Sequence, residues 1–125
     1  MRKCSLYALV ILISIVIMSC VSQPKIKVGS ICTVEDGDGK FGIVKVLVIE
    51  DEIIHLKIYK NKYDKRPSKI DLRTLSIGSM HDKDGVGVGH SPFDKIGFYG
   101  WKPVEIAFET VTKDDLIGYE IWKDN

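Results

Sequence analysis

The alternation of hydrophobic and polar residues along the chain is typical of β-strands. Residues 41–50 are apolar at nearly every position apart from Lys45, and such a run predicts a central strand that is covered on both faces. Residues 53–60 alternate strictly, with His55 on the side opposite the expected core, so we expect this histidine to be exposed or packed at an edge. Since only two acidic residues, 51–52, separate the two runs, they predict a β-hairpin.

Further strands and connections are expected on either side of this hairpin. Residues 26–34 are rich in β-formers, and the acidic and glycine residues at 35–39 predict a turn after them. Residues 61–69 form a polar, basic connection, and residues 78–100 are rich in glycine and predict a long ordered loop. Residues 101–111 return to a strand pattern.

The C-terminal residues predict one short helical turn followed by a last strand. Thr112 with an acid three residues later approximates a capping box, so a helical turn is expected through Ile117, ending at Gly118. Residues 119–123 then look like a short strand. The fold class is therefore mainly β (α+β at most): a small antiparallel sheet, or an SH3-like barrel, which the strand, turn and long hairpin of the first half resemble.

The first residues have the layout of a signal peptide. Arg2 and Lys3 precede the apolar run 6–18, which is shorter than the roughly 20 residues of a membrane span. The run ends in Ile17-Met18-Ser19-Cys20, which resembles the lipobox of bacterial lipoproteins. The alternative is an uncleaved membrane anchor with a chance cysteine.

The lipobox resemblance implies a processing scheme and a location. It implies diacylglycerol on the Cys20 thiol, cleavage before Cys20, and an acyl chain such as palmitate on the new amine. Residues 1–19 would then be the signal peptide, 20–25 the lipidated cysteine and a short tether, and 26–125 a single β-rich domain. The protein would be anchored to the cell membrane. In a host with two membranes, Val21 in place of aspartate implies the outer membrane, facing the periplasm.

Charge and cysteine content narrow the class of protein. The chain has 18 basic and 17 acidic residues, and removing residues 1–19 takes away two basic ones, which leaves a net charge of −1. This balance argues against nucleic acid as a partner, because its binding needs surplus cations. Cys4 leaves with the signal and Cys20 carries the lipid, so Cys32 has no disulfide partner within the mature chain and is expected in the core.

One part of the glycine-rich segment suggests a metal hypothesis. Two imidazoles and two carboxylates there would suit zinc or copper if the loop folded back on itself. The residues are His81, Asp82, Asp84 and His90. The Asp-Gly pairs at 36–39 and 84–85 lack the ligand spacing of a calcium loop and are more typical of turns. Apart from this hypothesis, no cofactor is expected beyond the covalent lipid on Cys20.

Two groups of residues are candidates for partner binding. The first is a basic cluster with an interleaved tyrosine, which suits anionic headgroups or an acidic protein surface. The second is aromatic, and aromatic side chains often dominate protein interfaces. The candidates are Lys62, Tyr63, Lys65 and Arg66 in the first group, and Phe98, Tyr99 and Trp101 in the second.

The body of the chain is loosely similar to small uncharacterised bacterial domains. The resemblance covers most of residues 26–125 and implies a single intact domain, with no activity attached. It rests on Phe41-Gly42, Lys45-Val46-Leu47, His55, Tyr59, Arg66-Pro67, Gly89-His90, Trp101-Lys102-Pro103 and Gly118-Tyr119-Glu120-Ile121-Trp122.

No motif in the sequence indicates catalysis, so we expect a protein without enzymatic activity. The favoured hypothesis is a membrane-anchored lipoprotein of the cell envelope whose domain binds a protein partner. An immunity-type inhibitor of an envelope-targeted toxin is its concrete form. The alternatives are a structural or accessory envelope lipoprotein, and a metal-binding protein that uses the 81–90 segment.

Overall fold

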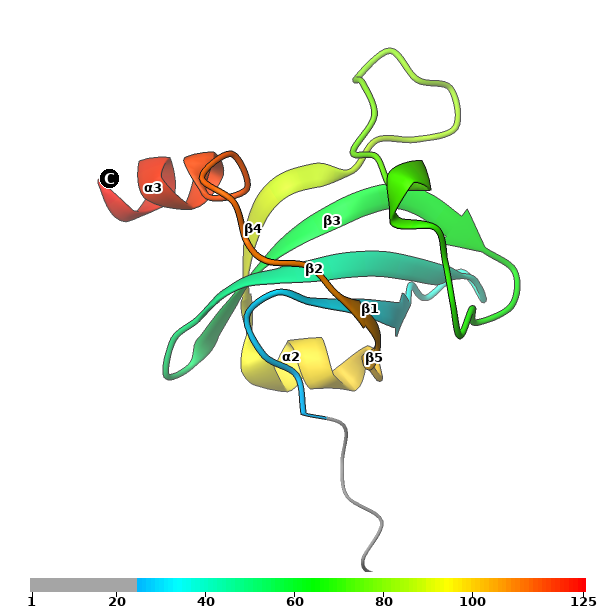
Figure 1. Cartoon of the computed structure of the whole chain (residues 1–125), viewed down its shortest axis with the longest axis horizontal. Coiled ribbons are helices and arrows are strands. Elements are labelled where there is room, and N and C mark those ends of the chain that lie inside the picture. Colours follow the sequence, from blue (N-terminus) through cyan, green and yellow to red (C-terminus); the bar gives the residue numbers. More distant parts are fainter. Residues whose placement is uncertain (1–24) are drawn as a thin grey trace, which may run out of the picture.

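Five antiparallel strands form one open sheet in the computed structural model of the chain, which describes residues 25–125 (Figure 1). The expected mainly-β class is confirmed, and the sheet is open rather than closed into an SH3-like barrel. The order across the sheet is β4-β3-β2-β1-β5. The strands are β1 (Ser30–Glu35), β2 (Phe41–Ile49), β3 (Ile53–Tyr63), β4 (Val88–Asp94) and β5 (Val104–Phe108).

The predicted hairpin is confirmed at the centre of the sheet. β2 pairs with β3 in antiparallel register, with Val46 opposite Leu56 and Ile49 opposite Ile54. Residues 42–47 are all buried, as expected for a strand with both faces covered. Cys32 of the neighbouring strand β1 is also fully buried, and this burial raises the pKa of its thiol to about 12. Cys32 therefore belongs to the core, as predicted.

Each face of the sheet carries its own hydrophobic cluster. On one face, Phe98 of the short helix α2 (Lys95–Gly100) joins aliphatic residues of β1, β2 and β3. On the opposite face, Ile31, Ile43 and Tyr59 pack against residues 70–75, which include the 3-10 helix η1 (Leu72–Thr74). Because both faces are covered, β2 and β3 have almost no solvent-exposed face near their centres.

The expected loop over residues 78–100 is wrong for its second half, which forms β4 and α2. Glycine and proline are poor strand formers, and both occur in β4. β4 lies at one end of the sheet, where a strand tolerates Pro92 because only one of its sides has to pair. The expected connection over 61–69 also begins too early, since β3 continues to Tyr63.

The C-terminal residues form a helix instead of the expected strand. α3 (Ile117–Lys123) runs through Gly118, where we expected a helical turn to end. The capping box itself is present: the Asp115 backbone N–H donates to the Thr112 hydroxyl at 3.1 Å, and the Thr112 N–H donates to the Asp115 carboxylate at 3.0 Å. The periodicity of a segment as short as residues 119–123 cannot distinguish a strand from a helix, and this explains the error.

The predicted signal peptide, lipobox and Cys20 lie outside the described residues. The helices within residues 25–125 include none with the length and hydropathy of a membrane span.

Candidate functional site

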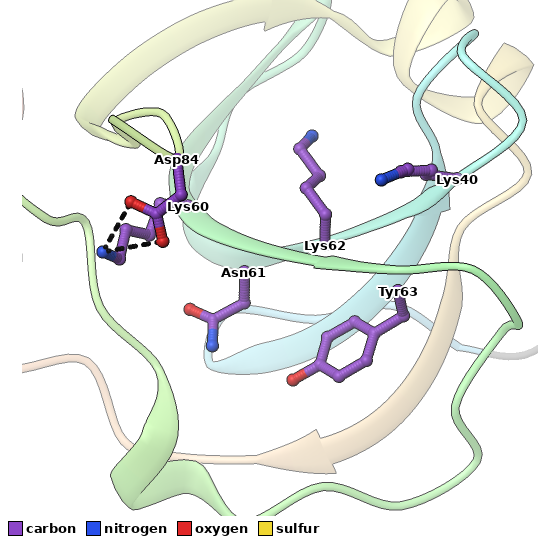
Figure 2. Close-up of a pocket in the computed structure, with 6 residues that line it drawn as sticks. All are labelled: Lys40, Lys60, Asn61, Lys62, Tyr63 and Asp84. Atoms are coloured by element: carbon purple, nitrogen blue, oxygen red, sulfur yellow. Dashed lines mark hydrogen bonds and ion pairs between the residues drawn. The ribbon is translucent and has the colours of Figure 1, made fainter. Parts of the chain in front are cut away.

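A recess of about 410 Å³ lies at the end of β3, where the strand passes the turn between β1 and β2 (Figure 2). Three of its six lining residues are lysines. Figure 2 shows Lys40 and Lys62 on one side of β3, and Asn61 and Tyr63 on the other. The lining residues are Lys40, Lys60, Asn61, Lys62, Tyr63 and Asp84.

Two of these lysines lie beside the turn at residues 36–40. The Lys62 ammonium is 3.1 Å from the Asp36 carboxylate, and Lys40 is 3.8 Å from Asp64. The side chains of Lys62 and Lys40 remain 42% and 54% exposed. Exposed ion pairs of this kind contribute little to stability, and their members stay accessible to a ligand.

The third lysine ties a loop to the sheet. The Lys60 ammonium donates to the Asp82 carboxylate at 3.0 Å and to Asp84 at 3.3 Å. Asp82 also accepts the Ser79 backbone N–H at 2.9 Å, and this bond together with Lys60 lowers the pKa of its carboxyl. The Lys60 backbone N–H donates to the Ser76 carbonyl at 2.8 Å, and the Gly87 N–H donates to the Ile77 carbonyl at 2.7 Å. The loop over residues 76–87 is therefore held at both ends and, through the Lys60 side chain, in its middle.

The 76–87 loop projects from the body of the protein. In Figure 1 it extends from the side of the sheet opposite to the place where the described chain begins, at residue 25 beside α2. Met80 is 90% exposed and Val86 is 52% exposed. Large apolar side chains on a projecting, internally bonded loop are a feature of contact surfaces.

The structure divides the candidate partner-binding residues into two groups. Lys62 and Tyr63 line the recess, and Lys65 is exposed beside it. Arg66 instead bonds within the protein: its guanidinium donates to the Thr33 hydroxyl at 2.7 Å and stacks over the Phe41 ring. Arg66 therefore holds residues after β3 against the sheet.

The prediction that three aromatic residues bind a partner is wrong for the buried ones. Phe98 is fully buried, so it is a core residue and not a surface contact. Trp101 is partly buried with its ring 4.7 Å from that of Phe93. Only Tyr99, which is 51% exposed, presents its ring to solvent.

The four residues of the metal hypothesis are divided between two places. Asp82 and Asp84 bind Lys60, and His81 is exposed in the same loop, whereas His90 packs against His55. Within residues 25–125, no group of three or more His, Cys, Asp or Glu side chains is arranged to hold a metal ion.

His55 and His90 form an imidazole pair that the sequence did not lead us to expect. His55 is fully buried, contrary to the expectation of an exposed or edge position. Its Nδ1 lies 2.9 Å from Nε2 of His90, so one ring donates a hydrogen bond to the other. The rings of Tyr119 and Trp122 in α3 contact His55 edge-on, each with its centroid 4.8 Å away.

The second nitrogen of His55 faces a carboxylate. Its Nε2 is 3.2 Å from the Glu50 carboxylate but lacks hydrogen-bond alignment with it, while Tyr119 donates its hydroxyl to the same oxygen at 3.2 Å. Desolvation and the neighbouring His55 lower the pKa of His90. The pair therefore favours a neutral His90 at neutral pH and fastens α3 to the sheet.

A signal for this cluster was present in the sequence. His55, Gly89-His90 and the 118–122 segment all belong to the pattern shared with small bacterial domains. They are far apart along the chain, and only the pairing of β3 with β4 and the return of α3 bring them together. Gly118 permits this approach, because a Cβ there would lie 2.6 Å from the His90 Cβ.

A second buried polar cluster lies beside the histidines. The fully buried Lys45 donates to the carboxylates of Asp115 and Glu109, both at 2.9 Å, and Lys57 donates to Asp115 at 2.9 Å. Burial alone would lower the pKa of Lys45, but the bonds to the two acids outweigh it and raise the pKa. This cluster secures the segment before α3.

Comparison of the chain with protein-family models, curated proteins and solved structures found no match.

Proposed function

We propose that this chain is a lipid-anchored protein of the cell envelope whose domain binds a protein partner and catalyses no reaction. The observation that carries the binding proposal is the lysine-lined recess beside the projecting 76–87 loop. The resemblance of residues 17–20 to a lipobox carries the anchor. Outer-membrane attachment facing the periplasm would follow in a host with two membranes.

The position of the loop supports this combination. The described chain starts beside α2, and the loop projects from the other side of the sheet (Figure 1). A domain anchored just before residue 25 would therefore hold the recess and loop away from the membrane. In that position they are accessible to another protein.

The chemistry of the recess favours an acidic partner surface. Lys40 and Lys62 keep accessible ammonium groups, and Met80 offers an exposed apolar side chain on the 76–87 loop, whose Asp84 lines the same recess. Charges at the rim of an interface steer association and set specificity, and a buried apolar side chain supplies affinity. An acidic toxin domain delivered to the envelope is the concrete partner that we propose, which makes the chain an immunity-type inhibitor.

The anchor is tested by metabolic labelling with an alkyne fatty acid, followed by membrane fractionation. The natural chain should carry the label and sediment with membranes. Cys20→Ser should lose both properties, whereas Cys32→Ser should keep them, since Cys32 is buried in the sheet. A labelled and sedimenting Cys20→Ser protein would contradict lipidation at this residue.

The binding surface is tested by cross-linking and capture of the full-length protein from its own envelope. We expect one stoichiometric partner that is lost in Lys62→Glu and in Met80→Asp. The matched control is Lys123→Glu on α3, a lysine of similar exposure far from the recess in sequence.

If the chain is an immunity-type inhibitor, the captured partner is a toxin. Expression of that partner in the envelope should therefore be toxic, and co-expression of the natural chain should remove the toxicity. An envelope defect on deletion of the gene, with no captured partner, would favour the accessory role instead.

A further inference from the structure

The side of the domain near residue 25, where the described residues begin, has its own exposed apolar residues. Ile96 is 83% exposed and Tyr99 is 51% exposed, although both belong to the six-residue helix α2, whose Phe98 is fully buried. The helix is fixed in this orientation, because Asp94 accepts the N–H groups of Ile96 at 2.7 Å and Gly97 at 3.2 Å. Solvent contact with Ile96 is thus a stable feature of the fold.

Exposed lysines occur in the two chain segments that adjoin α2. Lys25 and Lys27 are exposed where the described residues begin, and Ile26 between them packs against the cluster that contains Phe98 of α2. Lys102 lies two residues after the end of α2, and its side chain is 73% exposed, with its ammonium 3.8 Å from the Glu35 carboxylate. Aliphatic and tyrosine side chains with flanking lysines are the combination found where proteins contact the surface of a bilayer.

The length of the chain before residue 25 limits how the domain can turn. Lys25 is five residues after Cys20, and this stretch spans at most about 15–18 Å. A domain of about 100 residues has a radius of gyration near 13 Å, so its diameter is roughly 33 Å. The tether is too short to pass around the domain, and the α2 side must therefore stay nearest to the lipid.

We propose that the exposed face of α2 rests on the bilayer surface, with Ile96 and Tyr99 as its apolar contacts and Lys25, Lys27 and Lys102 of the adjoining segments as cations for the lipid headgroups. This inference rests on the proposed lipid anchor at Cys20. The contact makes the anchored domain stand in one orientation, with the 76–87 loop directed away from the membrane. The occupant of this face is the lipid surface itself and not a second protein.

The test uses the full-length, lipidated protein in vesicles of phosphatidylethanolamine and phosphatidylglycerol. An environment-sensitive nitrobenzoxadiazole label is placed at Ile96→Cys or, as a matched control, at Met80→Cys. Both positions are highly exposed, so neither substitution disturbs the core. Labelling is specific, because Cys20 is acylated on its sulfur and the Cys32 thiol is buried.

We expect the label at residue 96 to shift its emission to the blue and to be quenched by nitroxide-labelled lipids. The label at residue 80 should show neither effect. Adding Tyr99→Asp to the 96-labelled protein should reduce the quenching, and adding Val86→Asp should leave it unchanged.

Other outcomes would overturn the proposal in recognisable ways. An unquenched label at 96 in a protein that still sediments with the vesicles would refute the α2 contact and leave the anchor intact. A blue shift that depends on protein concentration and not on nitroxide lipid would assign the face to a second copy of the chain. A protein that fails to acquire the lipid would refute the anchor itself, and the inference would fail with it.

Discussion

Two lysine–aspartate clusters in this protein have nearly the same bond lengths and opposite surroundings. Lys45 bonds Asp115 at 2.9 Å inside the sheet, where the lysine side chain is fully buried and the aspartate side chain is 7% exposed. Lys60 bonds Asp82 at 3.0 Å at the surface, where the two side chains are 25% and 32% exposed. Similar geometry therefore occurs at two very different levels of solvation.

Solvent exposure, more than the distance between the charges, therefore determines how much an ion pair contributes to stability. Water stabilises the separated charges of the exposed cluster, so its net contribution is small. A buried charge that loses its partner has no such alternative. We infer that the Lys45 cluster maintains the fold, whereas the Lys60 cluster sets the shape of the 76–87 loop.

The largest expected effect is on the buried cluster. Asp115→Ala removes one of the two carboxylates that the buried Lys45 ammonium binds, while Glu109 remains, and should reduce the free energy of unfolding by about 1–3 kcal/mol. Urea denaturation followed by circular dichroism measures the loss. Asp114→Ala, at an exposed neighbouring position, is the control and should have little effect. Equal losses for the two variants would contradict the comparison.

Acid should weaken the fold in two stages. Asp115 has a pKa below its usual 3.8, so its contribution is complete above that pH and is lost as the pH falls below it. His90 has a pKa below its usual 6.5, and the unfolded chain therefore takes up that proton more readily than the folded chain does. Stability should decline as the pH falls below about 6.5.

Urea midpoints measured between pH 8 and pH 5 report the part of the pH dependence that comes from His90, because Asp115 stays ionised throughout this range. His90→Gln should flatten the dependence in this range, and His81→Gln, at an exposed loop position, should leave it unchanged. A steep decline that persists in His90→Gln would assign the effect to other groups.

The smallest effect on global stability is expected from the exposed cluster. Lys60→Met should leave the urea midpoint almost unchanged, because exposed ion pairs contribute little. It should nevertheless accelerate amide hydrogen exchange at Asp82 and other loop residues, since the loop loses its tie to β3. Lys65→Met, an exposed lysine without a recorded partner in the described part of the chain, is the matched control.

Local pattern was sufficient for the centre of the sheet. The long apolar run around Lys45 and the strict alternation after residue 53 predict β2, β3 and their hairpin, because a strand covered on one or both faces leaves such periodicities in the sequence. β4 escaped prediction because its glycine and proline carry no strand signal. α3 was assigned to the wrong class because the pattern of only five residues, 119–123, fits both a strand and a helix.

Local sequence pattern predicted only some residues of the candidate site. Lys62 and Tyr63 were identified from a basic cluster, and they do line the recess. Phe98 is not a surface contact because it is buried, and Arg66 is not available to a partner because it binds Thr33 within the protein. Neither exposure nor a hydrogen-bond partner can be predicted from composition. The histidine pair was missed because its members lie 35 residues apart.

The sequence by itself determined the mainly-β class, the central hairpin and the burial of Cys32, because these follow from periodicity and residue type within short segments. Only the tertiary structure decided which charges are buried, which lysine holds the loop and where two distant imidazoles meet. Those outcomes depend on register between strands and on the return path of the C-terminal segment. Local sequence does not specify either, because each is selected by the packing of the whole sheet.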